Sequence, residues 1–394
     1  MEKNNVGKVS PDACCGCQVC IQVCNHRAIT KALDKRGFEQ ISVDPKACVE
    51  CGLCEKVCPI LSKPLFNSDH IDNYACYALD NNIKTNGSSG GVFGLFASYV
   101  ISMGGAVYGA AFDANLKLKT TRATSILELA PLYKSKYLLC DTNGQYKQIK
   151  KDLNDGLIVL YCATPCQISA LKLYLRKDYE NLILIEFVCH GVGSQTMFDD
   201  SIKYIERKKG INIKSFTFRK KYKSASSHYY SFDYEHKGTK GMETNLYLCF
   251  PYYNAYCKQL NYRPTCYSCQ YAKEDRVADI TIGDFHTIAK YDTSIDRFAG
   301  VSMVTSNNRR GSNFLNLFRD EMHITTYPWE VLRENNRFDG GSSTTALANA
   351  FMSTYETGDF NILVKQYLTP LKDWKRLLYY NLPKFVRRFI TRTL

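Results

Sequence analysis

The feature that most constrains this chain is the spacing of eight cysteines near its start. They form two runs of the same pattern, Cys14-x2-Cys17-x2-Cys20-x3-Cys24 and Cys48-x2-Cys51-x2-Cys54-x3-Cys58. This spacing is typical of a domain that holds two [4Fe–4S] clusters, in which the fourth cysteine of each run binds the other cluster. We therefore assign one cluster to Cys14, Cys17, Cys20 and Cys58, and the second to Cys48, Cys51, Cys54 and Cys24. Cys15 lies outside the pattern and is predicted to be a bystander.

Structural zinc and disulfide bonds are the alternatives for these cysteines. Structural zinc takes four ligands, usually as two pairs, rather than two sets of four in this register. The chain starts MEKNNVGKVS, without an apolar signal segment, so we expect a cytoplasmic protein whose thiols bind metal. We predict a two-cluster ferredoxin domain over residues 1–62 and a linker over 63–75.

The rest of the 394-residue chain alternates between strand-like and helix-like segments. The strand-like runs are Ala106–Phe112, Leu157–Ala163, Leu182–Cys189, Asp279–Gly283 and Val301–Thr305. The helix-like stretches are Gln167–Lys177, Thr196–Lys209 and Asn313–Glu321. This order predicts a larger mixed α/β domain after the small ferredoxin-like (α+β) domain. We place it at 76–325, followed by an extension over 326–370, and expect Arg219–Gly241 to be a long loop or a β excursion.

Four further cysteines follow predicted strands or form a CxxC pair: Cys166, Cys189, Cys266 and Cys269. Strand ends are where α/β folds place their chemistry. These four thiolates are enough for a third [4Fe–4S] cluster, and zinc or a redox disulfide are the alternatives.

Several segments of this larger part resemble the coenzyme F-420 hydrogenase/dehydrogenase β-subunit family, here with a ferredoxin domain fused in front. The matching segments are NGSSGGVFGLFASYVISMGGAVYGAAFD (86–113), KSKYLLCD (134–141), VLYCATPCQISALKLYL (159–175), FVCHGVGS (187–194), FRKK (218–221), RPTCYSCQYAKEDRVADITIGDFH (263–286) and GVSMV (300–304). The resemblance implies a flavin, FAD or FMN, next to a third [4Fe–4S] cluster held by the domain's own cysteines. Ala163 and His286 replace a glycine and a tryptophan that are usual in the family.

The residues indicate where a flavin would bind. The small residues Asn86, Ser88, Ser89, Gly90 and Gly91 precede a predicted helix, whose N-terminus offers free N–H groups and a partial positive charge. A tightly capped helix start is the alternative.

Charged and titratable residues complete the predicted flavin site. We assign Lys136 to the flavin ring or phosphate and Gly283 to the same site. His190, His286 and Asp284 are the catalytic candidates, the histidines as proton donors and Asp284 as an orienting group. The alternative for Asp284 is a turn residue that closes a strand. The alternative for His190 and His286 is a histidine that is hydrogen-bonded to a backbone carbonyl.

The charge distribution and one uncharged stretch limit the partners. Of the net charge of +13, residues 371–394 supply about half, and no nucleic-acid motif accompanies it. That basic amphipathic tail predicts peripheral contact with an anionic membrane, at the inner face, or a helix docked on the domain. The uncharged stretch 85–112 carries seven glycines, so we do not expect it to span a membrane.

We predict an iron–sulfur flavoprotein oxidoreductase. It would relay electrons between an external carrier, such as a ferredoxin or an F-420-like deazaflavin, its clusters, the flavin and a small-molecule or sugar-linked substrate. A link to polysaccharide biosynthesis is one option for that substrate. The alternatives are a non-enzymatic electron-transfer subunit of a hydrogenase or dehydrogenase complex, and an assembly protein of an envelope-polysaccharide pathway.

Overall fold

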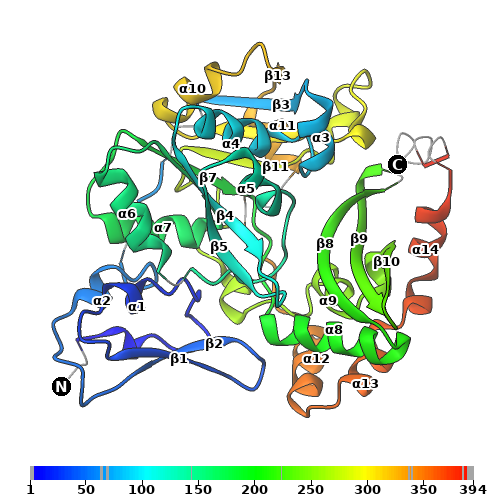
Figure 1. Ribbon diagram of the computed structural model, residues 1–394, viewed down its shortest axis with the longest axis horizontal. Coiled ribbons are helices and arrows are strands. Elements are labelled where there is room, and N and C mark those ends of the chain that lie inside the picture. The colour runs from blue at the N-terminus through cyan, green and yellow to red at the C-terminus, as the bar shows by residue number, and fades with distance from the viewer. Residues whose placement is uncertain are drawn as a thin grey trace.

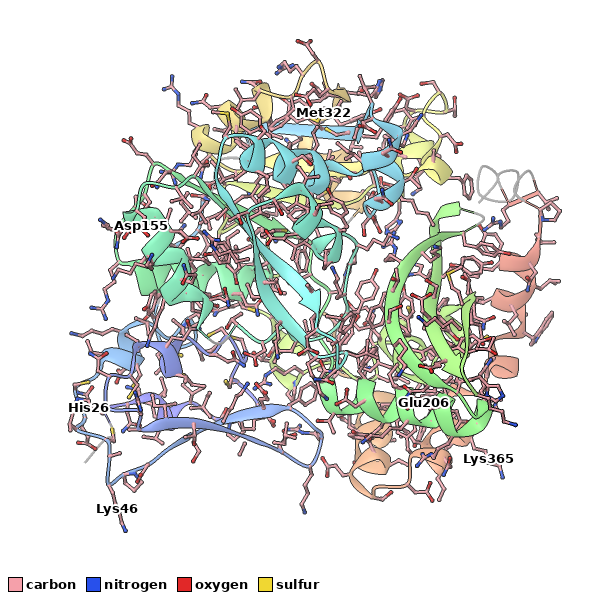
Figure 2. All side chains as sticks on the ribbon, in the orientation of Figure 1. His26, Lys46, Asp155, Glu206, Met322 and Lys365 are labelled. Atoms are coloured by element: carbon pink, nitrogen blue, oxygen red, sulfur yellow. The ribbon has the colours of Figure 1, made fainter. Side chains whose placement is uncertain are left out.

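The computed structural model describes residues 4–62, 65–67, 71–142, 144–222, 224–335, 338, 340–383 and 386–387. A small N-terminal domain packs against a layered domain built on an eight-stranded sheet, and a three-stranded sheet packs with the helices of the C-terminal part (Figure 1). With all side chains drawn, His26 and Lys46 lie at the outer edge of the N-terminal domain (Figure 2). The two-part organisation predicted from the sequence is therefore confirmed.

The N-terminal domain consists of a hairpin and two short helices. Strand β1 (Ile29–Leu33) pairs antiparallel with β2 (Glu39–Val43), and the helices are α1 (Val19–Val23) and α2 (Leu53–Lys56). Gly16 and Gly52 have φ angles of +71° and +72°. Residues without a Cβ adopt this left-handed conformation at little cost, which lets each cysteine run turn sharply.

The large sheet has the order β13-β3-β12-β11-β7-β6-β4-β5. Its strands are β3 (Asp72–Ala78), β4 (Ala106–Phe112), β5 (Leu118–Ala123), β6 (Val159–Ala163), β7 (Leu182–Phe187), β11 (Ile280–Asp284), β12 (Ser302–Ser306) and β13 (Met322–Thr326). The four central strands β4, β6, β7 and β11 are parallel, and the outer pairings are antiparallel. The carboxyl ends of the central strands therefore share one edge of the sheet, where sites form in such folds.

Helices cover both faces of this sheet. Alternating strand residues divide into two apolar layers, with Val159 and Tyr161 of β6 on one face and Leu160 on the other. The first layer packs on α6 (Gln145–Asn154) and α7 (Pro165–Leu175), and the second on α4 (Val92–Ser102) and α10 (Arg309–Asn316). The smaller helices are α3 (Asn81–Asn86), α5 (Ile126–Leu129) and α11 (Trp329–Asn335).

The second sheet decides between the two alternatives predicted for residues 219–241. They form a β excursion rather than a long loop, because β8 (Asn212–Tyr222), β9 (Ser224–His236) and β10 (Thr239–Leu246) pair as an antiparallel meander. Aromatic side chains of this sheet form a continuous core with the neighbouring helices. These helices are α8 (Gln195–Lys209), α9 (Pro251–Cys257), α12 (Ala346–Glu356), α13 (Phe360–Leu363) and α14 (Trp374–Asn381).

Most predicted elements are confirmed with small shifts. Strand β4 has the predicted bounds, and the helix predicted over Asn313–Glu321 starts four residues earlier, as α10. Strand β3 begins at Asp72, inside the segment predicted as a linker. None of the described helices is both long and apolar enough to cross a membrane. The uncharged stretch 85–112 folds instead as α4 and β4.

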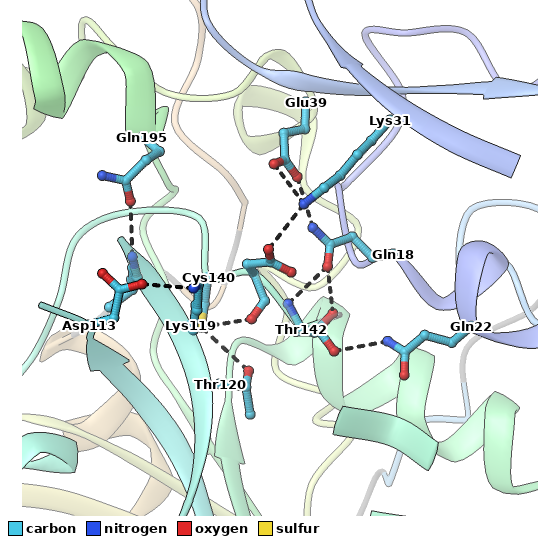
Figure 3. Close-up of polar contacts among 12 residues, drawn as sticks. Gln18, Gln22, Lys31, Glu39, Asp113, Lys119, Thr120, Cys140, Thr142 and Gln195 are labelled. Carbon is cyan, nitrogen blue, oxygen red and sulfur yellow. Dashed lines mark hydrogen bonds and ion pairs between the residues drawn. The ribbon is translucent and has the colours of Figure 1, made fainter. Parts of the chain in front are cut away.

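Buried hydrogen bonds join the N-terminal domain to the large domain (Figure 3). The hydroxyl of Thr142 donates to the Cys17 carbonyl at 2.8 Å, and its backbone N–H donates to Gln18 Oε1 at 2.9 Å. The side chain of Gln22 donates to the Thr142 carbonyl at 3.0 Å and accepts from the Tyr146 N–H at 3.0 Å. The loop that carries Cys17 is therefore fixed against the start of α6.

Candidate iron–sulfur and cofactor sites

One group of cysteines in the N-terminal domain surrounds a common cavity. Cys24, Cys48, Cys51 and Cys54 line a space of about 20 Å³. The side-chain amide of Asn5 donates to Cys48 Sγ at 3.7 Å, and Gly52 caps the helix that carries Cys54. The structure thus brings the fourth cysteine of the first run to the first three cysteines of the second.

The second group in this domain combines the other run with Cys58. The Cys58 thiol interacts electrostatically with Cys14, and Cys20 with both of them. Burial raises the pKa of Cys20 and Cys58, and the neighbouring thiolates raise it further because like charges repel. A cationic metal core that binds deprotonated sulfur relieves both penalties, so this donor set fits such a group.

The four later cysteines meet at the edge of the large sheet. Cys166 lies in the first turn of α7, after β6, and Cys189 follows β7. Cys266 belongs to a 3-10 helix, η4 (Pro264–Ser268), and Cys269 ends it. All four line one cavity of about 50 Å³, together with Cys15. Within the described residues, no three His, Cys, Asp or Glu side chains converge closely enough to hold a single metal ion.

Arg276 is a buried, ion-paired residue that lines this four-cysteine cavity. Its Nε is ion-paired with Glu186, which is fully buried, and its Nη1 donates to the carbonyls of Tyr271 and Lys273 at 3.1 Å. Its Nη2 lies buried without a hydrogen-bond partner among the described residues. Buried donors are usually satisfied, so the free N–H fits an anionic, sulfur-rich group held by the cysteines.

A larger cavity of about 210 Å³ lies next to the four-cysteine cavity. Most of the residues predicted for a flavin site line it: Ser88, Ser89, Gly91, Lys136, His190, Gly283, Asp284 and His286. Asn86 and Gly90 are not among its lining residues; Asn86 is exposed, and the Gly90 N–H donates to Ser302 Oγ at 3.0 Å. Residues 188–192 and Thr164 line both cavities. One thin wall therefore separates the two sites.

The serine-glycine segment forms the start of α4 at this cavity. Gly91 is the N-cap residue, with φ of +82°, and a Cβ there would lie 2.8 Å from the Lys84 Cα. The Ser89 hydroxyl is bonded to the Val301 carbonyl, and Ser88 Oγ accepts from the Ser135 N–H at 2.9 Å. The serine hydroxyls hold the turn, so the backbone N–H groups of the first helical turn are the donors left for a ligand.

Lys136 is a half-buried residue that lines the same cavity. Its Nζ donates to the carbonyls of Pro131 and Tyr133, each at 2.7 Å. Burial lowers the pKa of Lys136 to about 7, because removal from water disfavours the charged form. The ammonium therefore gains or loses its proton near neutral pH.

Arg219 is a site residue that the sequence analysis missed. Its Nη1 donates to Asp284 Oδ2 at 2.6 Å and to the Tyr137 hydroxyl at 3.0 Å. Burial raises the pKa of Asp284, but the Arg219 guanidinium and His286 outweigh it and hold that pKa well below its usual range. Asp284 is therefore an acceptor that orients Arg219, and His286 Nε2 lies 3.7 Å from the same oxygen. The segment FRKK (218–221), one of those that resemble the family, was the sequence signal that could have identified Arg219.

Comparison with known families agrees with these two parts. Residues 13–60 match the family described as "4Fe-4S dicluster domain". Residues 158–331 match the C-terminal region of the family described as "Coenzyme F420 hydrogenase/dehydrogenase, beta subunit". The chain therefore contains one region similar to each of these two families. The resemblance noted in the sequence is confirmed, and the dicluster domain implies two [4Fe–4S] clusters.

Two further comparisons complete this result. No curated protein matches this chain. Among solved structures, it is similar to a chain of "Xenon derivatization of the F420-reducing [NiFe] hydrogenase complex from Methanosarcina barkeri". The two are 15% identical, the alignment covers 74% of this chain and 91% of that one, and the TM-score is 0.45.

Proposed function

We propose that this chain is an iron–sulfur flavoprotein oxidoreductase with a third [4Fe–4S] cluster. The observation that carries the proposal is the wall of residues 188–192, which lines both the four-cysteine cavity and the larger cavity. A metal group and an organic redox group held on its two sides would be close neighbours. The bound clusters would supply single-electron transfer and the flavin would convert this into two-electron chemistry on a substrate.

The residues proposed to hold the third cluster are Cys166, Cys189, Cys266 and Cys269. Arg276 supports this assignment because it lines the cavity with these sulfurs, and its buried Nη2 has no hydrogen-bond partner in the described part of the chain. The same cation would offset part of the negative charge of four thiolates.

The flavin, FAD or FMN, is proposed to bind in the larger cavity. The N-terminus of α4, which follows Ser88, Ser89 and Gly91 in the sequence, offers backbone N–H donors to a phosphate or a ring carbonyl. Gly283 leaves room beside the cavity, and Lys136 provides a proton near neutral pH. The proposed proton donors toward a substrate are His190 and His286, while Asp284 keeps Arg219 in place.

The external electron carrier, a protein or a deazaflavin, is proposed to approach the N-terminal domain. Cys51 is exposed at the cavity that it shares with Cys24, whereas the cysteines near the large domain are more buried. This places an accessible cluster site on the outer side and a buried one on the inner side.

The basic tail is proposed to contact an anionic membrane surface peripherally. In α14 the side chains of Trp374 and Leu378 are 58% and 57% exposed, whereas Arg376 donates to the Tyr247 hydroxyl at 3.1 Å. One face of the helix is thus docked and the other is free. Residues 388–394 lie outside the described part of the chain.

Iron and flavin analysis of anaerobically purified protein tests the main proposal. We expect about twelve iron atoms, three clusters of four, and one flavin per chain. Cys189→Ser should lose about four iron atoms, whereas Cys257→Ser, at a half-buried cysteine that lines neither cavity, should lose none. About eight iron atoms in the wild type would exclude the third cluster, and a preparation without flavin would exclude the enzyme.

A non-enzymatic electron-transfer subunit is the second candidate, because the matched family is described as a β subunit. Such a chain would hold the same clusters but need a partner for turnover. Oxidation of its reduced flavin by candidate acceptors, without any added protein, would favour the enzyme.

A further inference from the structure

Cys15, which the spacing pattern left without a role, lies between two cysteine groups. Its side chain is 7% exposed and lines the four-cysteine cavity. It belongs to one apolar cluster with Cys17, of the N-terminal domain, and Cys166, of the large domain, packs against that cluster. The side chain predicted to be a bystander therefore lies among proposed ligands of two cluster sites.

Arg263 provides a second, independent feature at the same place. It is fully buried, its Nε donates to the Cys14 carbonyl at 2.5 Å, and its Nη1 has no hydrogen-bond partner among the described residues. A Cβ on Gly16 would lie 3.3 Å from this guanidinium, so the glycine leaves the space that Arg263 fills.

The charge of Arg263 needs compensation. No ion pair joins it to a carboxylate in the described part of the chain, and burial of an unpaired cation is costly. Its positive charge acts to lower the pKa of Cys266, one of the four cavity cysteines, because it favours the thiolate. The thiolate of Cys266, and the cluster proposed to bind there, would supply negative charge to balance it.

We propose that Cys15 and Arg263 form the junction through which the N-terminal domain exchanges electrons with the large domain. This rests on the third cluster of the proposed function. The Cys15 S–H donates to the sulfur of Cys17 or Cys166, and a hydrogen bond to sulfur raises a cluster's reduction potential. Arg263 offsets the repulsion between two anionic clusters. In this electron transfer, the cluster on one side of the junction is oxidised by one electron and the cluster on the other side is reduced by one electron. No bond forms or breaks.

The test uses the full-length chain, purified without oxygen, as Cys15→Ala, Cys15→Ser and a control. The control is Cys76→Ala, because Cys76 is a fully buried thiol in β3 that lines neither cavity. Iron content is measured first. Reduction potentials are then followed by electron paramagnetic resonance during a redox titration, which also reports magnetic coupling between neighbouring clusters.

We expect all three variants to keep the wild-type iron content. Cys15→Ala should lower a cluster potential and alter the coupling signal, with a change of up to about tenfold in the electron-sharing equilibrium, or about 59 mV. Cys15→Ser keeps an O–H donor and should lie between Cys15→Ala and the wild type. Cys76→Ala should match the wild type.

The possible outcomes distinguish failure of this junction from failure of the proposed function on which it rests. A wild type with about eight iron atoms removes the third cluster and the junction together. About twelve iron atoms with unchanged potentials and coupling in Cys15→Ala overturn the junction alone. Loss of about four iron atoms in Cys15→Ala would instead make Cys15 a ligand. Arg263→Lys, which keeps the charge, should shift the potentials less than Arg263→Gln; equal shifts would contradict the role of the charge.

Discussion

Replacement of Thr142 by valine should loosen the docking of the N-terminal domain without changing either domain's core. Thr142 is fully buried, and valine keeps its shape but lacks the hydroxyl that donates to the Cys17 carbonyl at 2.8 Å. A buried group that loses its partner costs about 1–3 kcal/mol. The Tyr146 hydroxyl still donates to the same carbonyl at 3.3 Å, so we expect the lower part, about 1–2 kcal/mol.

This cost corresponds to a roughly five- to thirtyfold rise in the undocked population, at 1.4 kcal/mol per factor of ten. Hydrogen exchange of the Tyr146 amide, which donates to Gln22 across the interface, reports that opening. The matched control is Thr305→Val, because the buried Thr305 hydroxyl has no hydrogen-bond partner in the described residues. Equal exchange at Tyr146 in Thr142→Val and the wild type, or an equal effect of Thr305→Val, would refute the reasoning.

Three further predictions follow from buried or exposed charges and apolar side chains. Between pH 7 and about 10.4, the folded state holds fewer protons at Lys136 than the unfolded chain does. The free energy of unfolding of the wild type should therefore rise with pH in that window, relative to Lys136→Met, as measured by urea denaturation. Asp284→Asn removes the carboxylate that is ion-paired with the buried Arg219 and should destabilise the protein by about 3–5 kcal/mol at pH 7, whereas a change below about 1 kcal/mol would contradict a strong ion pair. Trp374→Ser with Leu378→Ser should weaken co-sedimentation with anionic vesicles and leave iron content unchanged; unaltered binding would remove the tail as a membrane contact.

The cysteine spacing predicted the N-terminal domain well because it is a local constraint. Each run encodes its own turns, and Gly16 and Gly52 have the left-handed backbone that such turns require. The periodicity of the apolar runs likewise located the central strands, since buried parallel strands are continuous apolar segments bounded by turns.

The parts that were missed depend on contacts between distant segments. Gln18 and Thr142 meet across the domain interface, and no pattern within either segment indicates this pairing. Residues 219–241 are polar on alternate positions and lack the apolar density of a core strand, so the sequence left a long loop and a β excursion both open. Their pairing with neighbouring strands, and the packing of aromatic side chains against α8 and α9, decide for the β excursion. Arg219 became a site residue only through this sheet.

The negative charge of the three proposed clusters would account for part of the excess of positive charge in the chain. Each cluster with four thiolates carries roughly −2, so three clusters would lower the formal net charge from +13 to about +7, since 13 − 6 = 7. Arg263 and Arg276 are almost fully buried, and each keeps one guanidinium nitrogen without a partner in the described residues, near the cysteines of the third site. In a cluster-free chain these donors would be buried at a cost. In the proposed three-cluster protein, the buried charge of Arg263 would offset part of the negative charge of the third cluster, whereas Arg276 is already ion-paired with Glu186.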